Sequence, residues 1–315
     1  MKLKKGLSLI LFSIAGIHFF NKYTDYKSKI PVEIPEYNTY DYHWTYGTIH
    51  YIKAGSGKPL LLIHDLTAYS SSYEWHRIIS NLSKDHTVYA LDLLGCGESD
   101  KPSLTYTNYV FVKLITDFIK DIVKEACTII SSGKSSTIAL MSAKYDYPDQ
   151  TMIQKIIMIN PSSLSEEQTE ITEKDQKRDM LFQLPIIGTF LCNRLNKRED
   201  IEELFYNEYF ADSYQVKGKY IDQYYSSYFS NGKSSKSLFS RIYNHYTNFD
   251  YRIALDDIQI PLCIIGGDKE QGIKESLFNF SKYKNLSWCL LEETKHLPQL
   301  ENPTALTEKI DQYLD

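Results

Sequence analysis

The chain has 315 residues, of which 43% are hydrophobic and 24% charged, so it can bury the core of one large domain with an insertion, or of two domains. The chain has 35 Lys and Arg against 40 Asp and Glu, and the net charge of -5 argues against nonspecific electrostatic binding of nucleic acid. A mean hydropathy of -0.36 excludes a multi-span membrane protein.

The cysteines are odd in number and widely spaced, and no CxxC pair occurs in the sequence. We therefore predict buried thiols rather than a disulfide framework or a zinc cluster. No motif in the sequence calls for a metal or another cofactor. The five residues are Cys96, Cys127, Cys192, Cys263 and Cys289.

The N-terminus combines a basic start with an apolar run. Lys2, Lys4 and Lys5 precede an uncharged stretch from Gly6 to Phe20, which as a helix would cover about 22 Å of the ~30 Å hydrocarbon core of a bilayer. The run is apolar on all sides, unlike the striped helix of a soluble core. We therefore predict membrane association through this single segment. Lysines flank it on both sides, so the orientation stays open.

Two alternatives for the N-terminus remain. One is a cleaved signal peptide, because residues 13–15 (Ser-Ile-Ala) resemble a cleavage site, although apolar residues continue beyond it. The other is a soluble helix. In either case we predict that residues 31–43 form a linker that leads into the folded domain. This segment contains Pro31 and Pro35 and is rich in Tyr.

From Trp44 onward, short apolar runs alternate with amphipathic helical stretches. This alternation predicts an α/β fold with a mostly parallel central sheet flanked by helices. Strands are expected near 46–53, 59–63, 87–91, 127–130, 155–159, 261–265 and 287–291, and helices near 108–124, after 135 and over 303–314.

The alternation stops between Ser162 and about Asp257, where the apolar residues follow a helical period. This pattern predicts a helical insertion into the sheet domain. The expected organisation is an anchor and flank (1–30), a linker (31–43), a first core part (44–161), a helical cap (162–257) and a last core part (258–315).

Three motifs give the chain a resemblance to a known superfamily. Residues 55–59 (Gly-Ser-Gly-Lys-Pro) precede the run LLLIHD, Tyr73-Glu74-Trp75 follows, and the stretch from Asp92 to Pro102 reads DLLGCGESDKP. Together they resemble the α/β-hydrolase fold in its esterase, lipase and epoxide-hydrolase branch. The resemblance covers roughly residues 44–161 and 258–314, and it places the helical insertion where that family carries its cap.

The resemblance implies a nucleophile on a strand-to-helix elbow, then an acid, then a histidine base, in that chain order. His296, in the segment Thr-Lys-His-Leu-Pro, falls at the base position, where a neutral imidazole can accept a proton. Glu270 falls at the acid position, and Asp268 is the nearby competitor. A carboxylate there would orient the imidazole.

The elbow departs from the family pattern. That pattern has small residues on both outer positions and the nucleophile in the centre. Residues 131–135 read Ser-Ser-Gly-Lys-Ser, so the nucleophile position falls on Gly133, which has no side chain. Ser132, Ser131 and Ser135 are candidate substitutes, and a water activated by His296 is another.

The region expected to bind an oxyanion also departs from the family pattern. The family's His-Gly pair becomes His64-Asp65, and the backbone N–H groups expected to hold an oxyanion are those of Leu66 and Lys134. An aspartate beside a developing oxyanion opposes catalysis. His64 itself is expected to be a structural hydrogen-bonding residue.

Two nucleotide-binding motifs can be set aside. Gly133-Lys134-Ser135 matches the end of a phosphate-binding P-loop, but position 128, where the first glycine belongs, is Thr128 inside a strand. Gly95 and Gly97 lack the third glycine of a dinucleotide-binding loop, because position 100 is Asp100.

The insertion carries many aromatic residues at helical spacing. Most are expected to pack the cap, and the others could line a pocket for a small apolar or acyl ligand or face a membrane or protein partner. They are Tyr206, Tyr209, Phe210, Tyr220, Tyr224, Tyr225, Tyr228, Phe229 and Tyr243.

Two functions follow from these observations. The first is a membrane-anchored protein of α/β-hydrolase fold that lacks serine-nucleophile hydrolysis and acts as a binding or interaction module. The second is an esterase-type hydrolase in which His296 and Glu270 work through a neighbouring serine or an activated water.

Overall fold

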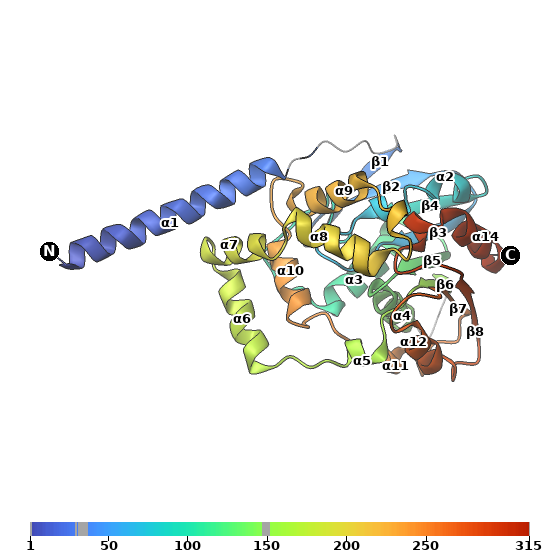
Figure 1. Cartoon of the computed structure of the whole chain (residues 1–315). Coiled ribbons are helices and arrows are strands. Elements are labelled where there is room, and N and C mark those ends of the chain that lie inside the picture. Colours follow the sequence, from blue (N-terminus) through green and yellow to red (C-terminus); the bar gives the residue numbers. More distant parts are fainter. Residues whose placement is uncertain (1, 29, 31–36, 147–151, 315) are drawn as a thin grey trace.

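An eight-stranded sheet forms the centre of the protein, in the strand order β1-β2-β4-β3-β5-β6-β7-β8 (Figure 1). β2 is antiparallel to β1 and β4, and the neighbouring pairs from β4 to β8 are parallel. The structure is a computed structural model that describes residues 2–28, 30, 37–146 and 152–314. The predicted fold class, an α/β-hydrolase fold with a mostly parallel sheet, is confirmed.

The strands in the middle of the sheet are buried on both faces. They are short continuous apolar runs, as expected for parallel strands that helices cover on either side. The bounds are β1 Thr39–Trp44, β2 Gly47–Ala54, β3 Lys58–Ile63, β4 His86–Leu91, β5 Cys127–Ser132, β6 Ile153–Ile159, β7 Leu262–Gly267 and β8 Leu286–Leu291.

The sheet register aligns the carboxyl ends of the parallel strands. Ile63 pairs with Ser131, Ser132 with Ile159, Ile159 with Ile265, and Gly267 with Leu291. The loops that follow β3, β5, β6, β7 and β8 therefore meet at one edge of the sheet. Functional side chains of open α/β sheets collect at this edge.

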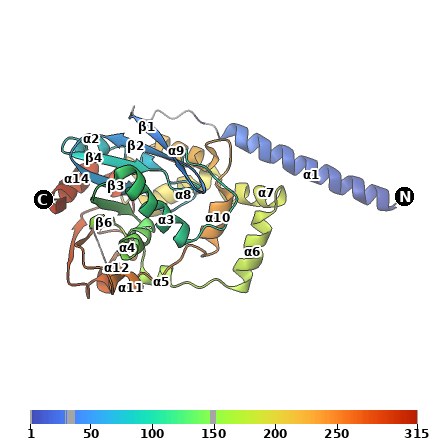
Figure 2. The same ribbon diagram turned by 180° about the vertical axis from the view of Figure 1, so that it is seen from behind.

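Two hydrophobic clusters hold the core helices on opposite faces of the sheet. One cluster includes α3, α4 and α12, and the other includes α2 and α14 (Figures 1 and 2). These helices are α2 Ile79–Leu82, α3 Asn108–Phe118 with the π-helical turn η2 Ile119–Val123, α4 Ser135–Tyr145, α12 Ile273–Phe280 and α14 Pro303–Leu314. Short 3-10 and α-helical turns add η1 Ser72–Trp75 and α13 Pro298–Glu301.

The chain between β6 and β7 is helical and covers the edge of the sheet where the strands end. Two aromatic clusters pack it against the core: one includes Tyr73, Tyr209 and Tyr224, the other Ala68, Tyr228 and Phe239. Tyr206 and Tyr243 are instead exposed. The helices are α5 Leu164–Glu167, α6 Glu173–Gln183, α7 Ile187–Arg194, α8 Arg198–Leu204, η3 Phe205–Tyr209, η4 Ser213–Gln215, α9 Gly218–Phe229, α10 Lys236–Tyr243 and α11 Arg252–Leu255.

The N-terminal residues form one long helix, α1 (Lys2–Lys27), which projects from the body of the protein and lies beside α7 at its C-terminal end (Figure 1). Across the described residues, no helix is both long enough and apolar enough to cross a membrane.

The predicted linker is partly a strand. Residues 31–36 lie outside the described part, but Thr39–Trp44 form β1 at the sheet edge, paired with β2 from Thr39–Ile52 to Trp44–Gly47. The prediction of a linker to residue 43 is wrong for this segment. Its polar and tyrosine-rich composition reflects an edge strand with one exposed face, a pattern that resembles a linker in sequence.

Candidate active site

His296 and Glu270 meet at the carboxyl edge of the sheet. His296 lies in the loop after β8, Glu270 lies in the loop after β7, and the imidazole Nδ1 is 3.0 Å from Glu270 Oε1. Asp268, the competing acid, accepts a hydrogen bond from the Thr294 N–H and pairs with Lys269. Of the two candidate acids, the structure thus places Glu270 against the imidazole.

Asn160, which follows β6, fixes the backbone of this pair. Its side-chain amide donates to the carbonyls of Lys295 (2.8 Å) and His296 (3.0 Å), and its Oδ1 accepts from the Gly267 N–H at 2.9 Å. Asn160 has a φ of 45°, in the left-handed region that asparagine tolerates better than most residues. The sequence alone gives no sign of this positioning residue, because only the fold brings Asn160 next to residues more than a hundred positions away.

The elbow between β5 and α4 has the expected strained backbone but no side chain at its apex. Gly133 has a φ of +52°, and a Cβ added there would lie 2.3 Å from Asp65 Oδ1. The carboxylate of Asp65, at the end of β3, therefore fills the space into which a nucleophile side chain would project. The absence of a side chain at position 133 is thus what allows the Asp65 carboxylate to lie there.

Asp65 also occupies the partners that a nucleophile and an oxyanion would use. Its Oδ1 accepts a hydrogen bond of 2.8 Å from the backbone N–H of Lys134, and its Oδ2 is 3.3 Å from His296 Nε2. The imidazole thus lies between two carboxylates, Glu270 and Asp65. The sequence indicates that Asp65 is unfavourable for an oxyanion, but it does not show that Asp65 contacts the base, His296.

Electrostatics fixes the charge state of this triad. Burial opposes ionisation of Asp65, but the hydrogen bonds from His296 and from the Lys134 N–H outweigh burial and lower the pKa of the carboxyl. Burial likewise opposes the imidazolium, but Asp65 and Glu270 raise the pKa of His296 well above its ordinary value. His296 is therefore protonated at neutral pH and cannot act as a general base in this state.

The three candidate serines are directed elsewhere. Ser131 Oγ bonds to Ser136 Oγ, Ser132 Oγ accepts from the Gln299 amide, and Ser135 Oγ donates to the His64 carbonyl at 2.6 Å. All three are buried. Their hydrogen bonds point them away from His296, whose Nε2 faces Asp65.

The two backbone groups expected to form an oxyanion hole differ in their surroundings. The N–H of Lys134 is already bonded to Asp65. Leu66 follows Asp65 directly and is buried. An incoming oxyanion would have to displace the aspartate from Lys134.

His64 is a structural residue, as the sequence suggested. Its Nδ1 is 2.7 Å from the Asp65 carbonyl, and its Nε2 accepts from the Leu93 N–H at 3.0 Å. Burial lowers the pKa of the imidazole, so the ring is neutral and able to accept from Leu93. His64 thereby ties the end of β3 to the loop after β4.

A second buried carboxyl, Glu74, lies behind Asp65. It accepts hydrogen bonds from the Asp65 N–H (3.1 Å), the Tyr224 hydroxyl (2.9 Å) and the Gln299 amide (3.3 Å). Burial and the charge of Asp65 raise the pKa of Glu74 to about 7. Since Tyr224 belongs to cap helix α9, Glu74 links the cap to the floor of the site.

The cap covers the imidazole with an aromatic ring. Tyr209 in η3 stacks on His296, with the ring centroids 5.2 Å apart, and its carbonyl accepts from the Leu297 N–H. Glu301 bonds the N–H groups of Lys295 and of Ala211, so the histidine loop and the cap are joined at a second point.

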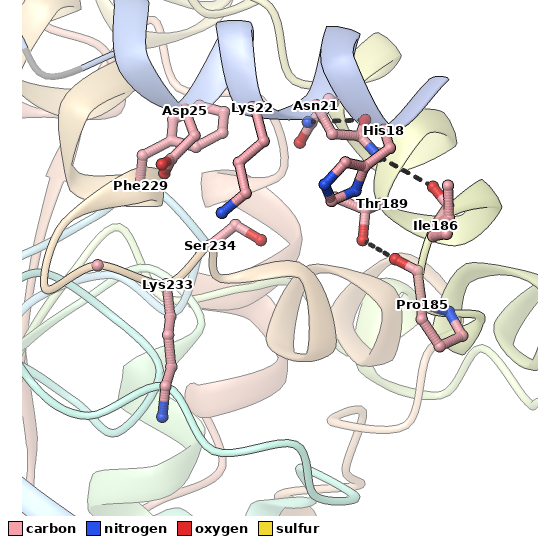
Figure 3. Close-up of a pocket in the computed structure, with 12 residues that line it drawn as sticks. His18, Asn21, Lys22, Asp25, Pro185, Ile186, Thr189, Phe229, Lys233 and Ser234 are labelled. Carbon is pink, nitrogen blue, oxygen red and sulfur yellow. Dashed lines mark hydrogen bonds between the residues drawn. The ribbon is translucent and has the colours of Figure 1, made fainter. Parts of the chain in front are cut away.

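Several cavities lie away from this centre. Three cavities among the described residues are lined by α1 and the cap (Figure 3), by α11 and α12, and by α5 and residues 245–253, and none of these three includes His296, Asp65 or Gly133. Within the described ranges, no group of three His, Cys, Asp or Glu is arranged to hold a metal ion.

The fold and the site define a class of protein. The profile of the α/β-hydrolase fold family matches residues 58–303, which is most of the chain, so the protein belongs to that family. The observed sheet order, the elbow after β5 and the helical insertion before β7 agree with this assignment.

Individual relatives include epoxide hydrolases. A soluble epoxide hydrolase of Corynebacterium sp. is 27% identical over 112 residues, covering 36% of this chain and 37% of that protein. Human epoxide hydrolase 4 is 27% identical over 284 residues, covering 84% of this chain and 75% of that protein. The ligand-free structure of the epoxide hydrolase CorEH has a TM-score of 0.70 at 20% identity, covering 89% of this chain and 99% of the other.

Replacing Glu74 by glutamine should change how stability depends on pH. Between its ordinary pKa of 4.5 and its folded value of about 7, Glu74 keeps a proton in the folded protein that it loses on unfolding, so stability falls as pH rises through this range. The Glu74→Gln variant cannot ionise there. Relative to that of the native protein, its free energy of unfolding should therefore rise by on the order of 2 kcal/mol between about pH 5 and about pH 8.

Denaturant unfolding of both proteins at several pH values measures this difference. Glu98→Gln, at an exposed glutamate, is the matched control and should follow the native curve. Parallel pH curves for the native protein and Glu74→Gln would show that Glu74 is ionised throughout, contrary to this prediction.

Proposed function

We propose that this protein lacks serine-nucleophile hydrolysis and acts as a binding or interaction module built on an α/β-hydrolase fold. The observation that carries the proposal is the position of Asp65. Its carboxylate occupies the space in front of Gly133, the Lys134 N–H and the Nε2 side of His296. Acyl transfer requires a hydroxyl nucleophile, an oxyanion donor and a neutral base. Gly133 lacks the hydroxyl, and the Asp65 carboxylate occupies the oxyanion donor and keeps the base protonated.

The ligand class proposed is a small apolar or acyl compound. Tyr209 and Tyr224 bring aromatic surface from the cap to the edge of the site, and such surfaces recognise apolar ligands. An anionic ligand is disfavoured at the centre, because the carboxylates of Asp65, Glu74 and Glu270 lie there together.

Restoring the elbow tests the loss of serine chemistry. The native protein should neither react with a serine-directed fluorophosphonate nor hydrolyse a short-chain aryl ester. Gly133→Ser alone would clash with Asp65, because a Cβ at position 133 meets its carboxylate. The double variant Asp65→Gly, Gly133→Ser should be labelled by the fluorophosphonate. It should hydrolyse the ester at least about a hundredfold faster than the native protein, since one oxyanion donor alone contributes a factor of ~10²–10³ to the rate.

The control is the double variant Asp65→Gly, Gly133→Ala, which opens the same space without a hydroxyl and should stay unlabelled. Labelling of the native protein would contradict the proposal, because it would show that the native site contains a reactive serine.

A second candidate function follows from the same carboxylate. With Oδ1 held by the Lys134 N–H and Oδ2 beside His296 Nε2, Asp65 resembles a carboxylate nucleophile, which forms a covalent ester intermediate. The relatives named epoxide hydrolases make an epoxide the substrate class to consider. Oδ2 would bond to an epoxide carbon while the C–O bond of the ring breaks, and the alkoxide would take the proton from His296.

Hydrolysis would complete this cycle. The ester on Asp65 is uncharged, so His296 would lose one of the two carboxylates that hold its proton and could then deprotonate a water that attacks the ester carbonyl. The products are a diol and the free carboxylate, and the oxygen of the water ends in Asp65.

Isotope labelling separates this candidate from ligand binding alone. A single turnover of styrene oxide in heavy-oxygen water should add one heavy oxygen to the peptide that contains Asp65, and Asp65→Asn should form no diol. Diol formation without label at Asp65 would exclude the nucleophile role, and the absence of any diol favours the binding module.

We also propose that α1 attaches the protein to a membrane surface. The supporting features are its uncharged stretch from Gly6 to Phe20 and the exposure of large apolar side chains, with Phe12 80% and Phe19 73% exposed. Flotation of the full chain with phosphatidylcholine vesicles tests this: the protein should move to the vesicle fraction, and a protein that stays in solution contradicts it.

A further inference from the structure

The strand β8 forms one edge of the sheet, and no further strand pairs with its outer side among the described residues (Figure 1). The carbonyls of Asn285 and Leu291 accept hydrogen bonds from the N–H groups of Leu262 and Asp268, at the two ends of β7. Successive residues of a strand point their backbone polar groups to opposite sides. The even-numbered residues of β8 therefore direct their N–H and C=O groups away from β7. They are Leu286, Trp288 and Leu290.

This edge lacks the features that keep exposed edge strands from pairing. Such strands commonly carry a charge, a proline or a bulge. The sequence of β8, Leu-Ser-Trp-Cys-Leu-Leu, contains neither charge nor proline, and its register with β7 is regular. Trp288 is 55% exposed and Leu290 is 36% exposed. The other edge strand, β1, differs because it carries the exposed Asp41. An apolar edge like that of β8 is expected to pair with another strand.

A second copy of β8 is complementary to this edge. When two copies of a strand pair antiparallel about a two-fold axis, one residue lies opposite its own copy. With Trp288 in that position, Leu286 lies opposite Leu290 of the second copy. Lys284, just before the strand, lies opposite Glu292 of the second copy, just after it. Residues whose backbone points outward thus meet one another, as a hydrogen-bonded antiparallel pair requires.

Charge selects this register over its neighbours. Lys284 and Glu292 are both exposed, and neither forms an ion pair within the ranges that the structure describes. A centre at residue 287 would place Lys284 opposite the apolar Leu290. A centre at residue 289 would place the apolar Leu286 opposite Glu292. Only the centre at Trp288 matches apolar with apolar side chains and cation with anion, which stabilises cross-strand pairs.

We infer that two copies of this chain associate edge to edge through β8 and form one continuous sheet. Trp288 and Leu286 bury apolar surface against the second copy, and Lys284 pairs with Glu292 of the second copy. One short strand buries little area, so we expect a weak dimer with a dissociation constant on the order of micromolar. Because the paired strands are antiparallel, the two candidate sites open on opposite sides of the dimer. The inference does not depend on the chemistry proposed at Asp65.

Charge reversal tests the register. Sedimentation velocity of the full chain, in a mild detergent that covers the apolar residues of α1, should show a dimer whose share rises with protein concentration. Lys284→Glu should weaken this dimer on the order of tenfold, because two symmetric pairs of opposite charge become pairs of like charge. Glu292→Lys should weaken it by a similar factor, and the double variant should restore it. Lys58→Glu, at an exposed lysine of β3, is the matched control and should dimerise like the native protein.

A cross-link locates the contact. In the inferred register Ser287 lies opposite Cys289 of the second copy, in a pair without backbone hydrogen bonds. The Cα atoms of such a pair are about 4.5 Å apart, which a disulfide can span. Cys263 lies opposite Ser287 across β7 and would compete for the new thiol, so it is replaced. The variant Cys263→Ala, Ser287→Cys should form a disulfide-linked dimer with oxidised glutathione, and dithiothreitol should reverse it.

Cys263→Ala alone is the control for the cross-link and should stay unlinked, because Cys289 and its copy are offset along the strands. Cross-linking of this control would overturn the register, since it would place Cys289 opposite itself. A native chain that stays monomeric would overturn the inference and leave the edge to a strand of another protein. A dimer that resists both charge reversals and forms no cross-link would also overturn it, because the association would then use another surface.

Discussion

The contact between the Asp65 carboxylate and the bare elbow at Gly133 is the constraint on which the site depends. A side chain at position 133 and a carboxylate at position 65 cannot coexist, because a Cβ would lie 2.3 Å from Asp65 Oδ1. Glycine therefore does more than remove a nucleophile. It makes room for a buried anion, whose charge then decides the protonation of His296 and the use of the Lys134 N–H.

The surroundings stabilise this buried anion. An unpaired carboxylate in the interior would be neutralised, yet the pKa of Asp65 is lowered because an imidazolium and a backbone N–H are within hydrogen-bond distance. Glu74 cannot share these donors, and its pKa is raised to about 7. Neighbouring carboxyls in one site thus differ in charge because their partners differ.

Membership in the α/β-hydrolase fold family leaves the reaction open, since one fold hosts many functions and the site decides between them. Here the acid Glu270 and the histidine follow the elbow in the chain order of the family and contact one another, while the space at the nucleophile position is filled by Asp65, which follows β3. This arrangement suits a module that binds without acyl chemistry, and it also suits a carboxylate nucleophile. The two differ in whether Asp65 forms a covalent bond with the ligand.

The sequence by itself determined the sheet, the helical insertion, the glycine at the elbow and the positions of His296 and Glu270, because buried strands, helical periods and loop motifs are local patterns. It could not show that Asp65 reaches His296 or that Asn160 fixes the histidine loop. Those contacts join residues 231 and 136 positions apart. Only the parallel register, which brings the carboxyl ends of β3, β5, β6, β7 and β8 to one edge, placed these side chains within hydrogen-bond distance. Local sequence likewise could not separate an edge strand from a linker at residues 39–43, because pairing with β2 decides between them.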